Sequence, residues 1–279
     1  STCKVDGLSR EPIHHSQVGN LPCSSYIRVV FHQSRWMCLV SADVQPSAIM
    51  RIKNVIRGIL FDIDGTLIDS VDLHAECWQA AFKHFGYEIP FSAIRSQIGK
   101  GGDQLMPVFL PKEDLKSKGE DIQKYRKALY LREYLPKVKP FPEVPQLFKV
   151  IRDHGQQMAL ASSASDEELE MYKRLIPMED YVRAATTADD ADKSKPHPDI
   201  FEAAIKKLGL PPNELIVVGD SPYDAIAARK ANVETVGVLC GGFPEKVLEE
   251  AGCIAIYQDP SDLRKNYEQS PLAGFPKSA

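Results

Sequence analysis

The second half of the chain alternates between short apolar runs and amphipathic segments, and this alternation restricts the possible folds. Apolar runs predicted to be strands lie at residues 157–161, 181–186, 215–218, 235–239 and 254–257. Amphipathic segments predicted to be helices lie at residues 144–154, 166–175, 198–208, 223–231, 245–251 and 261–268. Such alternation predicts an α/β fold in which helices cover both faces of a parallel sheet. Ligands bind such a sheet at the carboxyl ends of its strands.

An earlier apolar run, Val55 to Phe61, predicts one more strand, and it ends directly in two acidic residues, Asp62 and Asp64. Neighbouring carboxylates repel each other unless a proton or a cation lies between them. A hard cation such as Mg²⁺, which prefers oxygen ligands, is the simplest solution. We therefore predict that Asp62 is a nucleophile and that Asp64 donates and accepts a proton. A solvated acidic turn is the alternative, whereas an EF-hand calcium loop does not fit, because Leu67 stands where its glycine belongs.

Two later strands also end in residues suited to binding phosphate or metal. Ser162 and Ser163 follow one predicted strand, and hydroxyl groups near a helix start can bind a phosphoryl oxygen. Asp220 follows another, where its carboxylate can complete an oxygen shell for a metal ion. Asp224, one helical turn later, can orient a metal-bound water or a neighbouring lysine. At both places an ordinary helix N-cap is the structural alternative.

A lysine adds a third element to this pattern. Lys195 lies just before a predicted helix that begins with Pro198, and proline suits a helix start because its backbone is already constrained. A rigidly presented ammonium group can neutralise charge that develops on a phosphoryl group. A solvated lysine in a turn is an equally good interpretation of this residue taken alone.

Together these residues resemble the four motifs of the haloacid dehalogenase superfamily, in the usual order and spacing. The motifs are Asp62-Ile63-Asp64-Gly65-Thr66, Ser162, Lys195 and Gly219-Asp220-Ser221 with Asp224. The resemblance spans roughly residues 55–262, and it implies a Rossmann-like core, a Mg²⁺ cofactor and an aspartyl-phosphate intermediate. Asp64 argues against the dehalogenase branch of the superfamily, which lacks an acid at this position.

The resemblance also implies a role for each residue. Asp62 would attack phosphorus, and Asp64 would protonate the leaving oxygen and then activate water. Mg²⁺ would be held by the carboxylates of Asp62 and Asp220 and by the main-chain carbonyl of Asp64, while Asp224 would support the lysine or the metal. The phosphate-binding residues would be Ser162, Ser163 and Lys195.

The chain between the first strand and the later alternation has a helical pattern and no convincing strand. We therefore predict a helical cap at residues 69–141, inserted into an α/β core formed by residues 50–68 and 142–279. The resemblance implies a cap of the superfamily's first type, which would select the substrate.

Three positions in and beside this cap stand out. Lys100 lies in a glycine-rich loop and could reach the substrate when the cap closes, although a flexible turn is the alternative. His74 lies ten residues after Asp64 and could face the cleft, but packing within the cap is the favoured interpretation. At the predicted hinge, Pro142-Glu143 stands where relatives often have Pro-Gly, which puts the flexibility of the hinge in question.

Residues 1–49 differ from the rest of the chain. They contain three acidic and four basic residues and little hydrophobic periodicity. Met50 is followed at once by the first strand pattern, so we interpret Met50 as the natural start and residues 1–49 as an upstream extension without an assigned role. An organelle transit peptide is the alternative.

Composition argues against several classes of function. A net charge of −4 gives no basic field that would attract nucleic acid or an anionic membrane. No apolar run approaches the roughly 18 residues of a membrane span. The six cysteines form no C-x-x-C pair, which argues against a zinc ribbon and predicts a reducing, cytoplasmic location. We expect a monomer that acts on a small phosphorylated metabolite.

Three functions remain open at this point. The leading hypothesis is a Mg²⁺-dependent phosphatase. A sugar phosphomutase similar to β-phosphoglucomutase would share all four motifs, but Gly219-Asp220 is closer to the phosphatase pattern than the Glu-Asp common in such mutases. A non-catalytic phosphate-binding protein on the same fold is the third. A scaffold has no need for the full set of Asp62, Asp64, Lys195 and Asp220, which argues against it.

Overall fold

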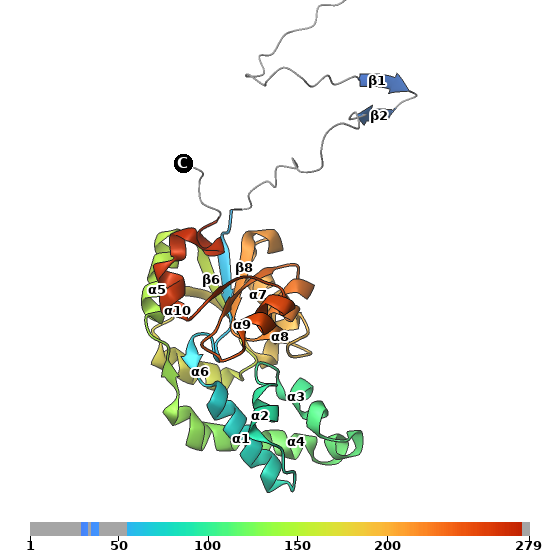
Figure 1. The fold of residues 1–279 in the computed structure, drawn as a ribbon, viewed down its shortest axis with the longest axis vertical. Coiled ribbons are helices and arrows are strands. Elements are labelled where there is room, and N and C mark those ends of the chain that lie inside the picture. The colour runs from blue at the N-terminus through green and yellow to red at the C-terminus, as the bar shows by residue number, and fades with distance from the viewer. Residues whose placement is uncertain (1–28, 33–34, 39–54, 275–279) are drawn as a thin grey trace, which may run out of the picture. The chain divides into compact units, whose positions relative to one another are not determined.

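The structure, a computed structural model, describes residues 29–32, 35–38 and 55–274 (Figure 1). The chain divides into two compact units, residues 1–52 and residues 53–279. In the first unit, strands β1 (Val29–His32) and β2 (Arg35–Cys38) pair in antiparallel fashion. The rest of the predicted N-terminal extension (residues 1–49) and Met50, the predicted natural start, lie outside the described residues.

The second unit is built on a six-stranded sheet, as the alternation predicts. Its strands are β3 (Gly58–Phe61), β6 (Gln157–Ala161), β7 (Val182–Thr186), β8 (Leu215–Gly219), β9 (Glu234–Val238) and β10 (Cys253–Tyr257). The spatial order is β10-β9-β8-β3-β6-β7, and every neighbouring pair is parallel. The predicted Rossmann-like α/β fold is confirmed. Strand β3 begins three residues later than the apolar run, but it still ends at Phe61, directly before Asp62.

Helices cover both faces of this sheet. They are α5 (Val144–Asp153), α6 (Asp166–Leu175), α7 (Asp199–Leu208), α8 (Pro222–Lys230), α9 (Glu245–Ala251) and α10 (Pro260–Lys265). Successive residues of β3 point to opposite faces, so Ile59 and Phe61 pack with α5, α6 and α10, whereas Leu60 packs with α7 and α8. Figure 1 shows α5 and α10 on one side of the sheet and α7 and α8 on the other. Because β3 and β8 are entirely buried, they hold the residues just beyond their ends in fixed positions.

Residues 71–137 form a set of helices that we call the helical block. It comprises α1 (Val71–His84), α2 (Phe91–Arg95), α3 (Gly102–Phe109) and α4 (Lys112–Leu129). These helices enclose a hydrophobic cluster of their own, separate from the clusters under the sheet. Helix α4 does not continue to the end of the block as a regular helix, because it passes into a wider turn at Tyr130–Tyr134 and a 3-10 turn at Leu135–Lys137. Among the described helices, none has a stretch long and apolar enough to cross a bilayer.

Two short strands connect the helical block to the sheet. Strand β4 (Ile68–Asp69) pairs in antiparallel fashion with β5 (Lys139–Pro140). The sequence reading, which found no strand in this region, is wrong here, because two residues are too few to show an alternating pattern. The predicted domain boundaries, at 68/69 and 141/142, fall at this connection, and the assignment of residues 69–141 as a cap stays a prediction.

Glu143, at the predicted hinge, has a left-handed backbone with φ of 62°. Such a conformation costs a non-glycine residue about 1–2 kcal/mol. The Oε2 atom of Glu143 accepts hydrogen bonds from Arg264 Nε at 2.6 Å and Ser261 Oγ at 3.1 Å. The carboxylate is thus tied to α10, which explains how a residue other than glycine is accommodated at this position.

Two glycines with open space around them should respond oppositely to alanine. Gly119 lies inside α4 with an ordinary helical φ, and a Cβ there meets nothing within 4 Å. Gly119→Ala should therefore raise the free energy of unfolding by about 0.5–1 kcal/mol, because alanine loses less entropy in a helix. Gly155 is equally open but has φ of +74°, so Gly155→Ala should lower stability by about 1 kcal/mol. Urea unfolding of the two variants checks this, and changes of the same sign would contradict it.

Candidate active site

Three buried carboxylates meet at the carboxyl ends of β3 and β8. The two strands are neighbours in the sheet, so Asp62 and Asp220, just beyond their ends, lie close together. Carboxylate oxygens of Asp62, Asp220 and Asp224 all lie within 4.8 Å of one another. Thr66 Oγ1 donates a hydrogen bond to Asp220 Oδ1 at 3.1 Å and so links the two strand ends.

Lys195 is the counter-ion of this cluster. Its Nζ atom lies 2.5 Å from Asp62 Oδ1 and 2.7 Å from Asp224 Oδ1, and it also donates to the carbonyl oxygen of Ala161 at 3.0 Å. The side chain is 1% exposed, so the ion pairs are shielded from water. One ammonium group cannot balance three carboxylates, and the fully ionised cluster would keep two uncompensated negative charges.

The pKa values of the cluster reflect this imbalance. Burial, with the negative charges of Asp224 and Asp64, raises the pKa of Asp62 to about 7 against the opposing effect of Lys195. Burial and the same kind of repulsion raise the pKa of Asp220 well above its usual range. For Lys195, burial would lower the pKa, but Asp224 and Asp62 outweigh it and raise it. A hard divalent cation with oxygen ligands fits this donor set, because it supplies the missing positive charge without protonation.

Two glycines make room for the Asp220 carboxylate. A Cβ atom at Gly241 would lie 1.8 Å from Asp220 Oδ2, and one at Gly65 would lie 2.4 Å from the same atom. Gly65 belongs to the first motif, whereas the sequence analysis assigned no role to Gly241. Its role follows only from the packing of the loop after β9 against the end of β8.

Asp64 points toward the helical block instead of into the cluster. Its Oδ1 atom accepts hydrogen bonds from Ser70 Oγ at 2.7 Å, His74 Nε2 at 2.8 Å and Tyr172 OH at 3.0 Å. Burial alone would raise the pKa of Asp64, but the hydrogen bonds from His74, Ser70 and Tyr172 outweigh it and hold the pKa below its usual range. In this arrangement Asp64 is an ionised acceptor.

His74 both packs the helical block and contacts the site. Its ring stacks on Tyr130, with centroids 4.1 Å apart, as the packing interpretation expects. An Nη2–H group of Arg126 contacts His74 Nδ1, and a guanidinium can only donate. Nδ1 must therefore be the acceptor, and Nε2 carries the hydrogen that is donated to Asp64. The sequence alternatives, packing or cleft, are both realised in one side chain.

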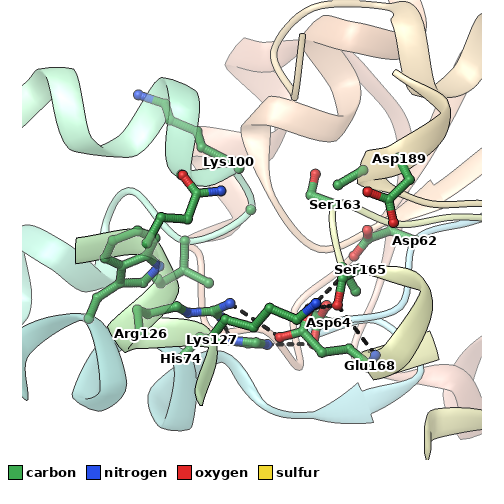
Figure 2. Close-up of a pocket in the computed structure, with 18 residues that line it drawn as sticks. Asp62, Asp64, His74, Lys100, Arg126, Lys127, Ser163, Ser165, Glu168 and Asp189 are labelled. Atoms are coloured by element: carbon green, nitrogen blue, oxygen red, sulfur yellow. Dashed lines mark hydrogen bonds and ion pairs between the residues drawn. The ribbon is translucent and has the colours of Figure 1, made fainter. Parts of the chain in front are cut away.

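A pocket of about 250 Å³ lies between these carboxylates and the helical block (Figure 2). Asp62, Asp64, Ser163 and Lys100 are among its lining residues, and Ser162 is not. Ser162 Oγ accepts a hydrogen bond from the main-chain N–H of Ala164 at 3.0 Å, which leaves its own hydrogen free to be donated. The helix N-caps are Ser165 for α6 and Ser221 for α8, so the serines proposed for phosphate binding are not needed as caps.

Sequence reasoning missed several residues around this pocket. Arg126 on α4 pairs with Glu168 on α6, with Nη1 and Oε1 3.2 Å apart, and Tyr172 on α6 reaches Asp64. Ser165 and Glu168 form a capping box, a pattern that is visible in the sequence. No local signal marks Arg126 or Tyr172, because their partners lie on other elements.

Comparisons with known proteins agree with this fold and these motifs. The sequence model of the family described as haloacid dehalogenase-like hydrolase matches residues 59–238. The pyrophosphatase PpaX of Oceanobacillus iheyensis is 30% identical over 184 residues, which cover 66% of this chain and 83% of that protein. A phosphoglycolate phosphatase of Aquifex aeolicus is 28% identical over 186 residues, which cover 66% of this chain and 85% of that protein. The crystal structure of a hydrolase from Pseudomonas syringae matches with a TM-score of 0.68 at 27% identity, covering 76% of this chain and 97% of that chain.

Gly241→Ala should disrupt the carboxylate cluster although none of its aspartates is substituted. The added methyl group would overlap Asp220 Oδ2 and displace that carboxylate. We expect stability to fall by about 1–3 kcal/mol, as in other overpacked sites, and the increase in melting temperature caused by Mg²⁺ to be lost. Thermal unfolding with and without Mg²⁺ measures both effects. Gly119→Ala is the matched control and should keep the full Mg²⁺ response, and a normal response in Gly241→Ala would contradict the assignment.

Proposed function

The chain belongs to the haloacid dehalogenase-like hydrolase family, and from this premise we propose that it is a Mg²⁺-dependent phosphatase that hydrolyses a small phosphorylated metabolite through an aspartyl-phosphate. Its phosphatase relatives make it a phosphoric monoester hydrolase. One observation carries the finer proposal: Lys195 lies between Asp62 and Asp224, beside Asp220, and leaves two negative charges to be balanced.

Mg²⁺ would be held by the carboxylates of Asp62 and Asp220 and by the main-chain carbonyl oxygen of Asp64. Bound there, the ion would offset the two excess negative charges and draw electron density from a phosphoryl oxygen. Asp224 would hold Lys195 in place through the 2.7 Å ion pair.

The first half of the reaction transfers the phosphoryl group to the protein. A carboxylate oxygen of Asp62 attacks phosphorus, the bond from phosphorus to the leaving oxygen breaks, and that oxygen takes a proton from Asp64. In the second half, Asp64 removes a proton from water, the resulting hydroxide attacks phosphorus, and the bond to Asp62 breaks to release inorganic phosphate. The groups that hold the phosphoryl oxygens in both halves are Ser162, Ser163 and Lys195.

In its observed position, Asp64 is suited to accept a proton but not to donate one. With a lowered pKa it is ionised at neutral pH, a state that can accept a proton but has none to donate. Proton donation therefore requires that Asp64 leave the hydrogen bonds of Ser70, His74 and Tyr172. Because Ser70 is the N-cap residue of α1 and His74 lies within α1, we propose that movement of the helical block, as a cap, releases Asp64.

Substitution of the nucleophile gives the most direct test of this proposal. Asp62→Asn should lower phosphate release from a panel of phosphate esters by at least about 10³-fold, because a neutral amide cannot form the intermediate. Free phosphate and isomerised ester are measured together in the presence of Mg²⁺, since isomer formation would indicate a phosphomutase. Asp153→Asn, on the surface of α5, is the control and should retain activity. Full activity in Asp62→Asn would remove this residue from the mechanism.

The affinity for Mg²⁺ should depend on pH in a defined direction. Without metal, Asp62 keeps a proton up to pH about 7, and Mg²⁺ must displace it in order to bind the carboxylate. The apparent affinity should therefore rise at least about tenfold per pH unit below pH 7, because Asp62 releases one proton and Asp220, whose pKa is also raised, holds a second that Mg²⁺ must displace. Titration calorimetry from pH 5.5 to 8.5 measures this, and an affinity that does not change with pH would contradict the raised pKa.

A further inference from the structure

We propose that the substrate of this pocket is a sugar or polyol monophosphate, whose leaving group is uncharged and rich in hydroxyl groups. A substrate with a second anionic group, such as pyrophosphate or phosphoglycolate, would be disfavoured. The proposal rests on the phosphatase function proposed above and names its substrate class. It is carried by the charges and hydrogen-bonding groups of the pocket wall opposite Asp62.

Two of the pocket's basic side chains are already paired with acidic partners. Arg126 Nη1 lies 3.2 Å from Glu168 Oε1, and Lys127 Nζ lies 3.3 Å from Glu167 Oε2. The Arg126–Glu168 pair is nearly dry, with side chains 14% and 3% exposed. A guanidinium group held in such a pair has little charge left to attract a second anion.

Lys100 does not supply the missing positive charge. Figure 2 shows its side chain directed away from Asp62. Its Nζ atom donates a hydrogen bond to Gln97 Oε1 at 2.5 Å and lies 4.6 Å from the ring centroid of Tyr223. The amino group thus already has partners in Gln97 and Tyr223, neither of which lines the pocket.

The charge of the whole lining leads to the same conclusion. Among the described residues, it contains four acidic side chains against three basic ones: Asp62, Asp64, Glu168 and Asp189 against Lys100, Arg126 and Lys127. His74 adds no charge, because Arg126 donates to its Nδ1 atom. The charge of a divalent cation would be balanced by the carboxylate cluster at Asp62. A second anionic group of the substrate would therefore lie in the rest of the pocket without a counter-ion.

The remaining polar groups suit hydroxyl groups, which both donate and accept. Arg126 Nε is buried without a hydrogen-bond partner and can donate. The Gln123 amide can donate and accept, and the Asp189 carboxylate can accept. The indole of Trp78 lines the same cavity and offers an apolar surface for carbon-bound hydrogens. At about 250 Å³ the cavity is below the usual range for drug-sized ligands, which agrees with a small leaving group.

The first experiment compares substrates on the full chain with Mg²⁺. The panel contains hexose, pentose and glycerol monophosphates, pyrophosphate, phosphoglycolate and p-nitrophenyl phosphate, and kcat/KM is measured for each. We expect kcat/KM for the best sugar or polyol phosphate to exceed that for pyrophosphate and for phosphoglycolate at least about tenfold, a difference of roughly 1.4 kcal/mol. If p-nitrophenyl phosphate is cleaved but pyrophosphate or phosphoglycolate has the highest kcat/KM among the other substrates, the inference is wrong and the phosphatase proposal stands. If nothing is cleaved, both are wrong.

A second experiment removes the neutralising charge. Glu168→Gln keeps an acceptor for the capping box with Ser165, because glutamine also serves at that position, but it frees the charge of Arg126. The ratio of kcat/KM for phosphoglycolate to that for the best sugar phosphate should rise about tenfold, mainly through KM. Glu170→Gln is the matched control, since Glu170 lies on the same helix and pairs with Lys173 at the surface. An unchanged ratio in a folded Glu168→Gln protein would overturn the role of this pair, and the substrate panel does not depend on that variant.

Discussion

The burial of three carboxylates around a single lysine is the constraint on which the rest of this structure depends. Asp62, Asp220 and Asp224 lie within 4.8 Å of one another, and Lys195 can balance only part of their charge. Buried charges of one sign are unstable unless a proton or cation joins them. The sheet accommodates the cluster because β3 and β8 are wholly buried and hold its members at adjacent strand ends. The excess negative charge of such a site favours the binding of a cation even without substrate.

The helical block is bound to the same site by several contacts. Arg95 Nη2 donates to the carbonyl oxygen of Gly241 at 3.0 Å, and Tyr223 OH donates to that of Ser96 at 2.6 Å. These bonds place the block against the start of α8 and the loop that follows β9. Asp64 is bonded to the block as well, through His74. In the proposed mechanism, proton transfer by Asp64 therefore depends on the position of the block.

The pocket illustrates how a basic side chain can line a site without adding net charge to it. Arg126 contacts an acid, a histidine and two aromatic rings. Its positive charge is balanced by the carboxylate of Glu168. Relatives named as a pyrophosphatase and as a phosphoglycolate phosphatase each match 66% of this chain. In the proposed mechanism the motifs of the core bind the phosphoryl group, which all such substrates share. The pocket wall that contains Arg126 and Glu168 would contact the part that differs, and we propose that its charge balance selects the substrate.

The sequence by itself determined the sheet and the residues at its strand ends. Strand periodicity, the acidic pair at Asp62 and Asp64, and the later positions Lys195 and Asp220 are local signals, and parallel strands necessarily bring their carboxyl ends to one edge. Only the tertiary structure decided where Asp64 points, that His74 contacts it, and that Arg126 is neutralised by Glu168. These contacts join α1, α4 and α6, which are distant in sequence, and each depends on how the helical block packs against the sheet. Even Gly241 has no recognisable sequence signal, because the atom it must avoid belongs to a side chain on another strand end.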